Sequence, residues 1–116
     1  MGSHFLYEFN DTINQIIRKP SLFSIDDKKG KPVNIQYEIG KRPVFACGNE
    51  RSGGDTYMLL FSQGSKYPSF QLMVNHDDAA REFAYEEPDS ISLMWAKKYN
   101  WHVVNMKSDW KTIFVK

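Results

Sequence analysis

The chain has 116 residues, of which 41% are hydrophobic and 15% aromatic, and its 15 Lys and Arg residues against 14 Asp and Glu residues give a formal net charge of +1. This composition is too rich in aromatic and aliphatic side chains for a disordered segment, and too balanced in charge for a module that binds nucleic acid by neutralising phosphates. No apolar run approaches the roughly 20 residues needed to cross a bilayer, and the one Cys cannot form an internal disulfide, so we expect a folded domain with neither nucleic-acid nor membrane partners.

The first four residues are small and polar and do not fit the pattern that follows, so we interpret residues 1–4 as an expression-tag remnant. Residues 5–116 are then expected to form a single domain, because a chain of this length buries enough surface for one modest core. Since we interpret the start as a tag remnant, the sequence does not decide whether the protein is cytoplasmic or periplasmic.

Two β-prone runs lie on either side of a polar cluster near the start. Residues 5–9 and 13–17 flank Asn10-Asp11-Thr12, which predicts a β-hairpin whose second strand ends before Pro20.

A short helix is predicted next, over residues 31–39. Pro32 suits the first helical position, Ile35 and Ile39 lie four residues apart on one face, and Gly40 suits the position just after the last turn.

A strand, a Gly-rich loop and a helix follow one another over residues 43–63. Residues 43–47 form a short apolar run, typical of a strand buried on both faces of a parallel sheet. Residues 48–55 form the loop, and residues 56–63 are expected to be helical up to Gly64. This order places polar side chains and backbone N–H groups at the carboxyl end of a strand, where open α/β sheets bind ligands.

Alternation of strands and helices continues to the end of the chain. Strands are predicted over residues 70–74 and 101–106, and helices over 79–85 and 91–99, with an Asn or Asp of residues 75–78 as the N-cap of the first helix. Trp110 and Phe114 lie four residues apart, which suits either a docking helix or exposed surface. The whole pattern predicts an α/β fold, a partial Rossmann-like layered arrangement with a mainly parallel sheet and helices, preceded by an N-terminal β-hairpin.

These segments together resemble the C-terminal portion of a haloacid dehalogenase-like hydrolase of the bacterial phosphoserine-phosphatase-like branch. The resemblance rests on Lys31-Pro32-Val33 before a helix, on the buried strand that leads into Gly48-Asn49, and on Gly54-Asp55 with Met58-Leu59. It extends over residues 24–28, 40–43, 74–76, 78–85, 103–107 and 109–111. The resemblance implies a fold of that hydrolase type and Mg²⁺-dependent hydrolysis of a phosphorylated small molecule.

The resemblance also implies roles for particular residues. Lys31 matches the catalytic Lys that pairs with the nucleophile and the phosphate. Asn49 stands where the family's metal loop has its first Asp, and Asp55 matches the second acid of that loop. Glu50 belongs to a two-residue insertion and is a third candidate oxygen ligand for Mg²⁺, although the altered loop implies weak or absent metal binding here.

The family's nucleophile motif, D-x-D, is absent. The Asp residues stand at positions 11, 26, 27, 55, 77, 78, 89 and 109, and no two of them are two residues apart. The chain therefore lacks the nucleophile and the general acid of the resembled hydrolase. We expect it to be a fragment that is inactive alone, with its status as an enzyme left open.

The residues alone also support other interpretations. Lys31 could be a solvated surface lysine, Asp55 a helix cap, residues 75–78 capping groups rather than metal ligands, and Cys47 a packing residue. Two other functions accordingly remain open. One is a non-catalytic α/β module that binds phosphate or a metal, and the other is an interaction domain that self-associates through an uncovered sheet edge and apolar faces.

Overall fold

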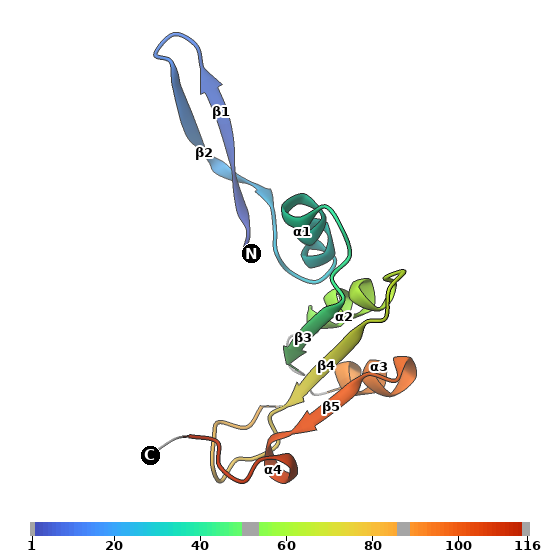
Figure 1. The fold of residues 1–116 in the computed structure, drawn as a ribbon. Helices are drawn as coiled ribbons and strands as arrows, with labels where there is room; N and C mark the ends of the chain where they lie inside the picture. The colour runs from blue at the N-terminus through green and yellow to red at the C-terminus, as the bar shows by residue number, and fades with distance from the viewer. Residues whose placement is uncertain (1, 50–53, 86–88, 115–116) are drawn as a thin grey trace.

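The computed structural model describes residues 2–49, 54–85 and 89–114. In chain order the elements are β1 His4–Asn10, β2 Gln15–Ser24, α1 Gly30–Ile39, β3 Phe45–Asn49, α2 Asp55–Gln63, β4 Phe70–Asn75, α3 Ile91–Tyr99, β5 His102–Asn105 and α4 Met106–Asp109 (Figure 1). β1 and β2 pair as an antiparallel ribbon, and β3, β4 and β5 form a parallel sheet in that order. The predicted α/β fold, with its N-terminal hairpin and partial Rossmann-like sheet, is confirmed.

Both crossover helices of the sheet lie on the same face. The chain moves from β3 through α2 to β4, and from β4 through α3 to β5, always in the same direction across the sheet. Right-handed crossovers in one direction place every connecting helix on one side. Within the described residues, no helix consequently covers the opposite face of the sheet.

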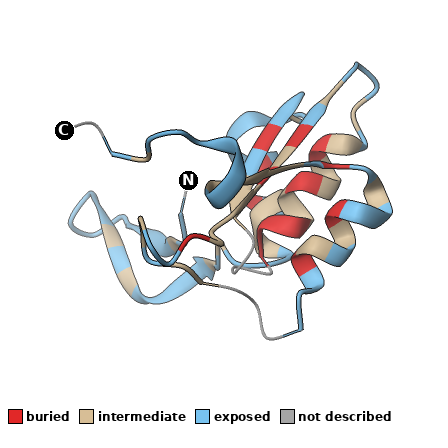
Figure 2. Ribbon diagram, turned by 90° about the horizontal axis from the view of Figure 1, so that it is seen from below, coloured by how far each residue is buried: buried red, intermediate tan, exposed pale blue. Residues whose placement is uncertain are grey.

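The hydrophobic core lies between this sheet and the two helices. It consists of Ala46 from β3, Leu59 from α2, Met73 from β4, Ala96 from α3, and Trp101 just before β5, all of them buried. In Figure 2 the buried parts of the ribbon gather where the helices face the sheet. Because the strands are short and only one face is covered, the core is small for a chain of this length.

The N-terminal ribbon lies outside this core and runs further than the sequence indicated. β2 continues through Pro20 to Ser24, so the predicted end of the strand before Pro20 is wrong. Pairing shifts register between Phe5, which lies opposite Leu22, and Tyr7, which lies opposite Arg18. Pro20 falls within that irregularity, where a missing N–H breaks no regular ladder hydrogen bond.

Helix α1 begins and ends close to the predicted positions. It starts at Gly30, with Pro32 in its first turn, and it ends at Gly40, whose φ of 72° is in the left-handed region that glycine adopts without strain. The N–H of Gly40 donates to the carbonyl of Gln36, which closes the last turn.

The predicted helix over residues 79–85 is wrong. This segment forms a turn over residues 79–82 and a single antiparallel bridge between His76 and Tyr85. Asp78 accepts the backbone N–H of Ala80 at 3.1 Å, so its capping chemistry closes a turn instead of a helix. At the C-terminus, α4 ends at Asp109, and no helix joins Trp110 to Phe114 within the described residues.

Within residues 2–49, 54–85 and 89–114, no helix combines the length and the apolar content that a membrane crossing needs.

Arg81 attaches the C-terminal segment to the rest of the fold. Its guanidinium donates to the backbone carbonyls of Met106 at 2.7 Å, Lys107 at 3.0 Å and Trp110 at 2.7 Å. Its Nε donates to the carboxylate of Asp78, which lies three residues earlier. One side chain thus links the turn after β4 to the segment after β5.

The Asp78–Arg81 pair predicts acid sensitivity of this attachment. The Arg81 guanidinium holds the pKa of the Asp78 carboxyl below its ordinary value, and burial opposes this only in part. A carboxyl whose pKa is lowered on folding stabilises the fold above its unfolded pKa of about 3.9 and loses that contribution as the pH falls through the folded value. We expect the ¹H–¹⁵N NMR amide signals of Lys107 and Lys111 to shift in this acidic range as the segment detaches, since Arg81 binds the carbonyls of both residues.

The control must separate Asp78 from Asp109, because the backbone N–H of Asn105 and the hydroxyl of Ser108 lower the pKa of Asp109 as well. The Asp78→Asn variant should detach more readily at neutral pH and lose most of the acid transition. An unchanged acid transition in Asp78→Asn would contradict the assignment to this pair.

Candidate functional site

Lys31 of α1 and Asp55 of α2 meet at the carboxyl edge of the sheet, although 24 residues separate them in sequence. The Lys31 ammonium donates to Oδ1 of Asp55, and the two side chains are only 25% and 11% exposed. Partial removal of water strengthens their attraction relative to a surface pair. Two residues singled out in the sequence are therefore brought into direct contact.

Asp55 also fixes the end of β3. Its Oδ2 accepts the backbone N–H of Asn49 at 3.1 Å. Asp55 is the first residue of α2, whose N-cap is Gly54, so its carboxylate does not cap its own helix. The alternative interpretation of Asp55 as a helix cap is accordingly wrong, and its negative charge is instead shared between Lys31 and the strand end.

Gly48 allows this arrangement because Asp55 lies directly over it. A Cβ at Gly48 would fall 2.5 Å from the Cβ of Asp55 and 2.8 Å from its Oδ2. Such distances are far inside van der Waals contact, so a larger residue would push the start of α2 away from β3. The glycine is thus needed for the close approach of two backbones.

A segment that the sequence did not associate with the site lies beside Asn49. The amide of Asn49 donates to the hydroxyl of Tyr85, and the Tyr85 ring stacks on His76 with centroids 4.5 Å apart. His76 in turn contacts the carboxylate of Glu82 at 3.0 Å. The sequence analysis did not associate Tyr85 with Asn49, because it predicted a helix over residues 79–85 and not the bridge that brings Tyr85 beside His76.

A small hollow opens beside Lys31. Asp26, Lys31, Ile35 and Met58 line about 180 Å³ of space. The amide of the fully buried Asn34 donates to Oδ1 of Asp26 at 3.0 Å, which orients that carboxylate. Since a water molecule occupies about 30 Å³ in the liquid, the hollow suits an ion or one small group rather than a whole metabolite.

The described residues do not form a magnesium centre. Asp55 already contacts the Lys31 ammonium and the Asn49 N–H, and a cation at that carboxylate disfavours a second one. No cluster of three His, Cys, Asp or Glu residues suited to a metal occurs in the described ranges. Glu50, the third predicted ligand, lies outside the described residues. Within residues 2–49, 54–85 and 89–114, the side chains therefore do not make up a ligand set that fits Mg²⁺, and none of the chemistry below passes through a metal.

Cys47 lies at an exposed position on β3, one residue before Gly48. The surrounding protein removes water from the thiol and raises its pKa, and the negative charge of Asp55 raises that pKa further. The thiol therefore stays protonated at neutral pH, and protonated thiols are poor nucleophiles.

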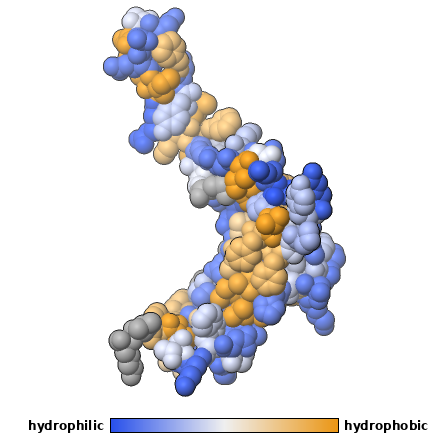
Figure 3. All heavy atoms as spheres, viewed as in Figure 1, coloured by the Kyte–Doolittle hydropathy of each residue, from blue (hydrophilic) through white to orange (hydrophobic). Residues whose placement is uncertain are grey.

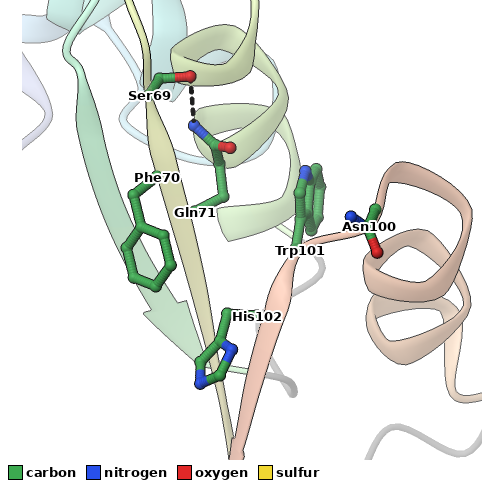
Figure 4. A pocket seen from close by; sticks show the side chains of 6 residues that line it. All are labelled: Ser69, Phe70, Gln71, Asn100, Trp101 and His102. Atoms are coloured by element: carbon green, nitrogen blue, oxygen red, sulfur yellow. Dashed lines mark hydrogen bonds between the residues drawn. The ribbon is translucent and has the colours of Figure 1, made fainter.

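A second hollow, of about 270 Å³, lies at the opposite edge of the sheet (Figure 4). Some of its polar side chains bond within the protein. Gln71 donates to Ser62 at 3.2 Å and to Ser69 at 3.1 Å, and the Trp101 indole donates to Gln63 at 2.8 Å. Asn100 and His102 also line this hollow, at the amino edge of the sheet, away from the Lys31–Asp55 pair.

No protein-family model matches the chain, and no curated protein matches it. The candidate site is therefore defined by its own geometry: an ion pair, a strand end and a small hollow at the carboxyl edge of a parallel sheet.

Because Asp55 lies so close to Gly48, adding one methyl group at position 48 should lower the stability of the fold. Gly48→Ala should displace Asp55, weaken its bonds to Lys31 and Asn49, and lower the free energy of unfolding by about 2 kcal/mol, as overpacking and a disturbed buried polar group usually do. Urea unfolding measures this change.

Gly64→Ala is the matched control. Its new methyl group would meet the far end of the Arg42 side chain, which can move, and its φ of −74° suits alanine. Equal destabilisation by the two substitutions would show that the contact with Asp55 has no special role.

Proposed function

We propose that the chain is the C-terminal portion of a haloacid dehalogenase-like hydrolase and that it binds the phosphoryl group of a phosphorylated small molecule through Lys31. The observation that carries this proposal is the Lys31–Asp55 ion pair beside the hollow at the carboxyl edge of the sheet. The sequence resemblance assigns these same two residues to the catalytic Lys and the metal-loop acid.

The group in the hollow that suits an anionic ligand is the Lys31 ammonium, since Asp26 and Asp55 both carry negative charge. Asp55 takes up one N–H of the Lys31 ammonium, which leaves the other N–H groups available for oxygens of a bound phosphate. The side chains of Ile35 and Met58 form apolar walls that lower the local dielectric and strengthen the attraction. Asp26 lies on the same hollow and disfavours a second negative group close to it, which restricts where the phosphate can bind.

Within the proposal, Lys31 stabilises charge and Asp55 positions Lys31. A lysine held against a carboxylate has little freedom to rotate, so it binds an incoming oxyanion with less entropic cost. Neither residue supplies the nucleophile. In the resembled hydrolases that group is an Asp of D-x-D, which this sequence lacks, so phosphoryl transfer would need a nucleophile from another polypeptide segment.

A second candidate function is an interaction domain. The observation that favours it is the extent of exposed apolar surface on the ribbon and on the open face of the sheet. A binding role for this surface does not conflict with phosphate binding, because the two lie in different parts of the molecule.

Phosphate binding should depend on Lys31. In a titration with inorganic phosphate followed by ¹H–¹⁵N NMR, the amide signals of Lys31, Ile35 and Met58 should shift, and Lys31→Met should weaken binding about tenfold or more, as loss of a charge-assisted hydrogen bond does. Lys31→Arg keeps the charge and should retain part of the affinity.

The matched control is Lys28→Met, which removes an equal charge from the loop before α1 without touching the hollow. Equal weakening by Lys28→Met would indicate that phosphate responds only to the net charge of the surface.

The chain by itself should not turn over a phosphate ester. Purified protein with Mg²⁺ and an aryl phosphate should release product no faster than a blank, because no D-x-D nucleophile is present. Mg²⁺-dependent hydrolysis that Asp55→Ala abolishes would overturn this expectation, whereas phosphate binding without turnover agrees with the proposal.

A further inference from the structure

The β1–β2 ribbon has one apolar face that nothing in the described chain covers. We call the residues Phe5, Tyr7, Phe9, Ile16 and Leu22 the apolar ribbon face. The pairing of Phe5 with Leu22 and of Phe9 with Ile16 places them on the same side of the ribbon. Tyr7, Phe9 and Ile16 are 58%, 56% and 64% exposed. Such an array on a protruding ribbon indicates an interaction surface.

The other face of the ribbon is more polar. It carries Glu8, Asn10, Gln15 and Lys19 together with the apolar Leu6 and Ile17, and the Lys19 ammonium contacts the Glu8 carboxylate at 2.7 Å. On the apolar ribbon face the charge of Arg18 lies over the Phe5 ring, 4.5 Å from its centroid. The ribbon therefore has the alternation of a strand pair with one buried and one solvated side, although its apolar side is bare.

A second bare apolar surface lies on the sheet. We call the residues Phe45, Cys47, Phe70, Leu72, His102 and Val104 the open sheet face, on the side opposite α2 and α3. The Phe45 and Phe70 rings stack 6.0 Å apart, and the rings of Phe70 and His102 are 5.7 Å apart. In Figure 4, Phe70 and His102 point away from the helix toward which Gln71 and Trp101 point. Figure 3 shows apolar side chains gathered over this part of the molecule.

The ribbon of one chain cannot cover its own open sheet face. Its base is held on α1, where His4 contacts Glu38 at 3.2 Å and the rings of Phe23 and Tyr37 lie 5.6 Å apart. From there the ribbon projects away from the sheet (Figure 1). The radius of gyration is 18.1 Å, whereas a compact domain of this length has about 13 Å. The two apolar surfaces are therefore separate in the monomer.

We propose that a second copy of this chain covers the open sheet face with its apolar ribbon face, and that the contact is reciprocal in a symmetric dimer. Both surfaces are unfavourable when exposed to water. An isolated two-stranded ribbon is marginally stable in water, and parallel sheets are nearly always covered on both faces. In a dimer with two-fold symmetry all four surfaces are covered, because the ribbon of each copy packs on the sheet of the other.

The area available is sufficient for a stable dimer. The aromatic side chains on the two surfaces are Phe5, Tyr7, Phe9, Phe45 and Phe70, and they are between 41% and 58% exposed. At about 200 Å² for each aromatic side chain, they leave roughly 500 Å² accessible per copy and about 1,000 Å² per pair. The aliphatic residues of both surfaces add to this, which brings the total into the range of roughly 1,200–2,000 Å² found for specific interfaces.

Sedimentation velocity over a wide range of concentration tests the dimer. The unmodified chain should form dimers, and Ile16→Asp should weaken dimerisation at least tenfold, because it places a carboxylate in the apolar contact. Gln15→Asp adds the same side chain on the opposite face of the ribbon and should dimerise normally. A monomer at every concentration, or equal effects of the two variants, would overturn the proposal.

The position of the contact is tested by disulfide trapping, for which Cys47 is a natural probe because it is the one cysteine of the chain and lies on the open sheet face. The Phe9→Cys variant should, on mild oxidation, form a covalent dimer linked between position 9 of one copy and Cys47 of the other. Asn10→Cys, on the polar side, should form this link much more slowly.

Peptide mapping of the trapped species separates the possible outcomes. Links only between two Cys47 residues, links within one chain, or equal rates for the two variants would each contradict the ribbon-on-sheet contact. The dimer does not depend on the proposed phosphate binding, since Lys31 lies on neither surface, so Lys31→Met should leave dimerisation unchanged while it weakens binding of phosphate.

Discussion

The one-sided covering of the parallel sheet is the constraint on which the rest of this structure depends. Three strands in the order β3, β4, β5 with crossovers in one direction place α2 and α3 on the same face. The core of Ala46, Leu59, Met73, Ala96 and Trp101 forms there, and the opposite face keeps its aromatic side chains in solvent. The same parallel arrangement brings the carboxyl ends of all three strands to one edge, which is where the polar groups of the candidate site gather.

At that edge, the electrostatics are built from a few close contacts. The Lys31–Asp55 pair offsets two charges that are both shielded from water, and the N–H of Asn49 binds the remaining carboxylate oxygen. Since removal of either partner would leave the other charge poorly solvated, the pair stabilises the position of α1 against α2 as well as defining a site. The close approach of Asp55 to Gly48 explains why a glycine stands at this point in the strand. A nearly neutral chain thus holds a paired Lys and Asp, partly shielded from water, at the carboxyl edge of its sheet.

The two ends of the chain are held by contacts that differ in kind. The C-terminal segment depends on one guanidinium, because Arg81 binds carbonyls of residues 106, 107 and 110 and is itself fixed by Asp78. The N-terminal ribbon is anchored to α1 at its base alone, and its apolar face has no partner within the described chain. Polar contacts therefore close one end of the molecule, whereas the other end exposes surface that a second chain can bury.

Local patterns in the sequence determined most of the elements. Short apolar runs predicted the three core strands, and the spacing of Pro32, Ile35 and Gly40 predicted α1, because these features act over a few residues. The pattern of residues 79–85 led to a wrong prediction of a helix. The hydrogen bonds of Arg81 and Tyr85 to distant segments outweigh the weak helical preference of this segment. Only the tertiary structure decided that Lys31 touches Asp55, that Gly48 makes room for it, and that one face of the sheet stays bare. Those facts depend on the handedness of the crossovers and on contacts between residues far apart in sequence, which no local pattern contains.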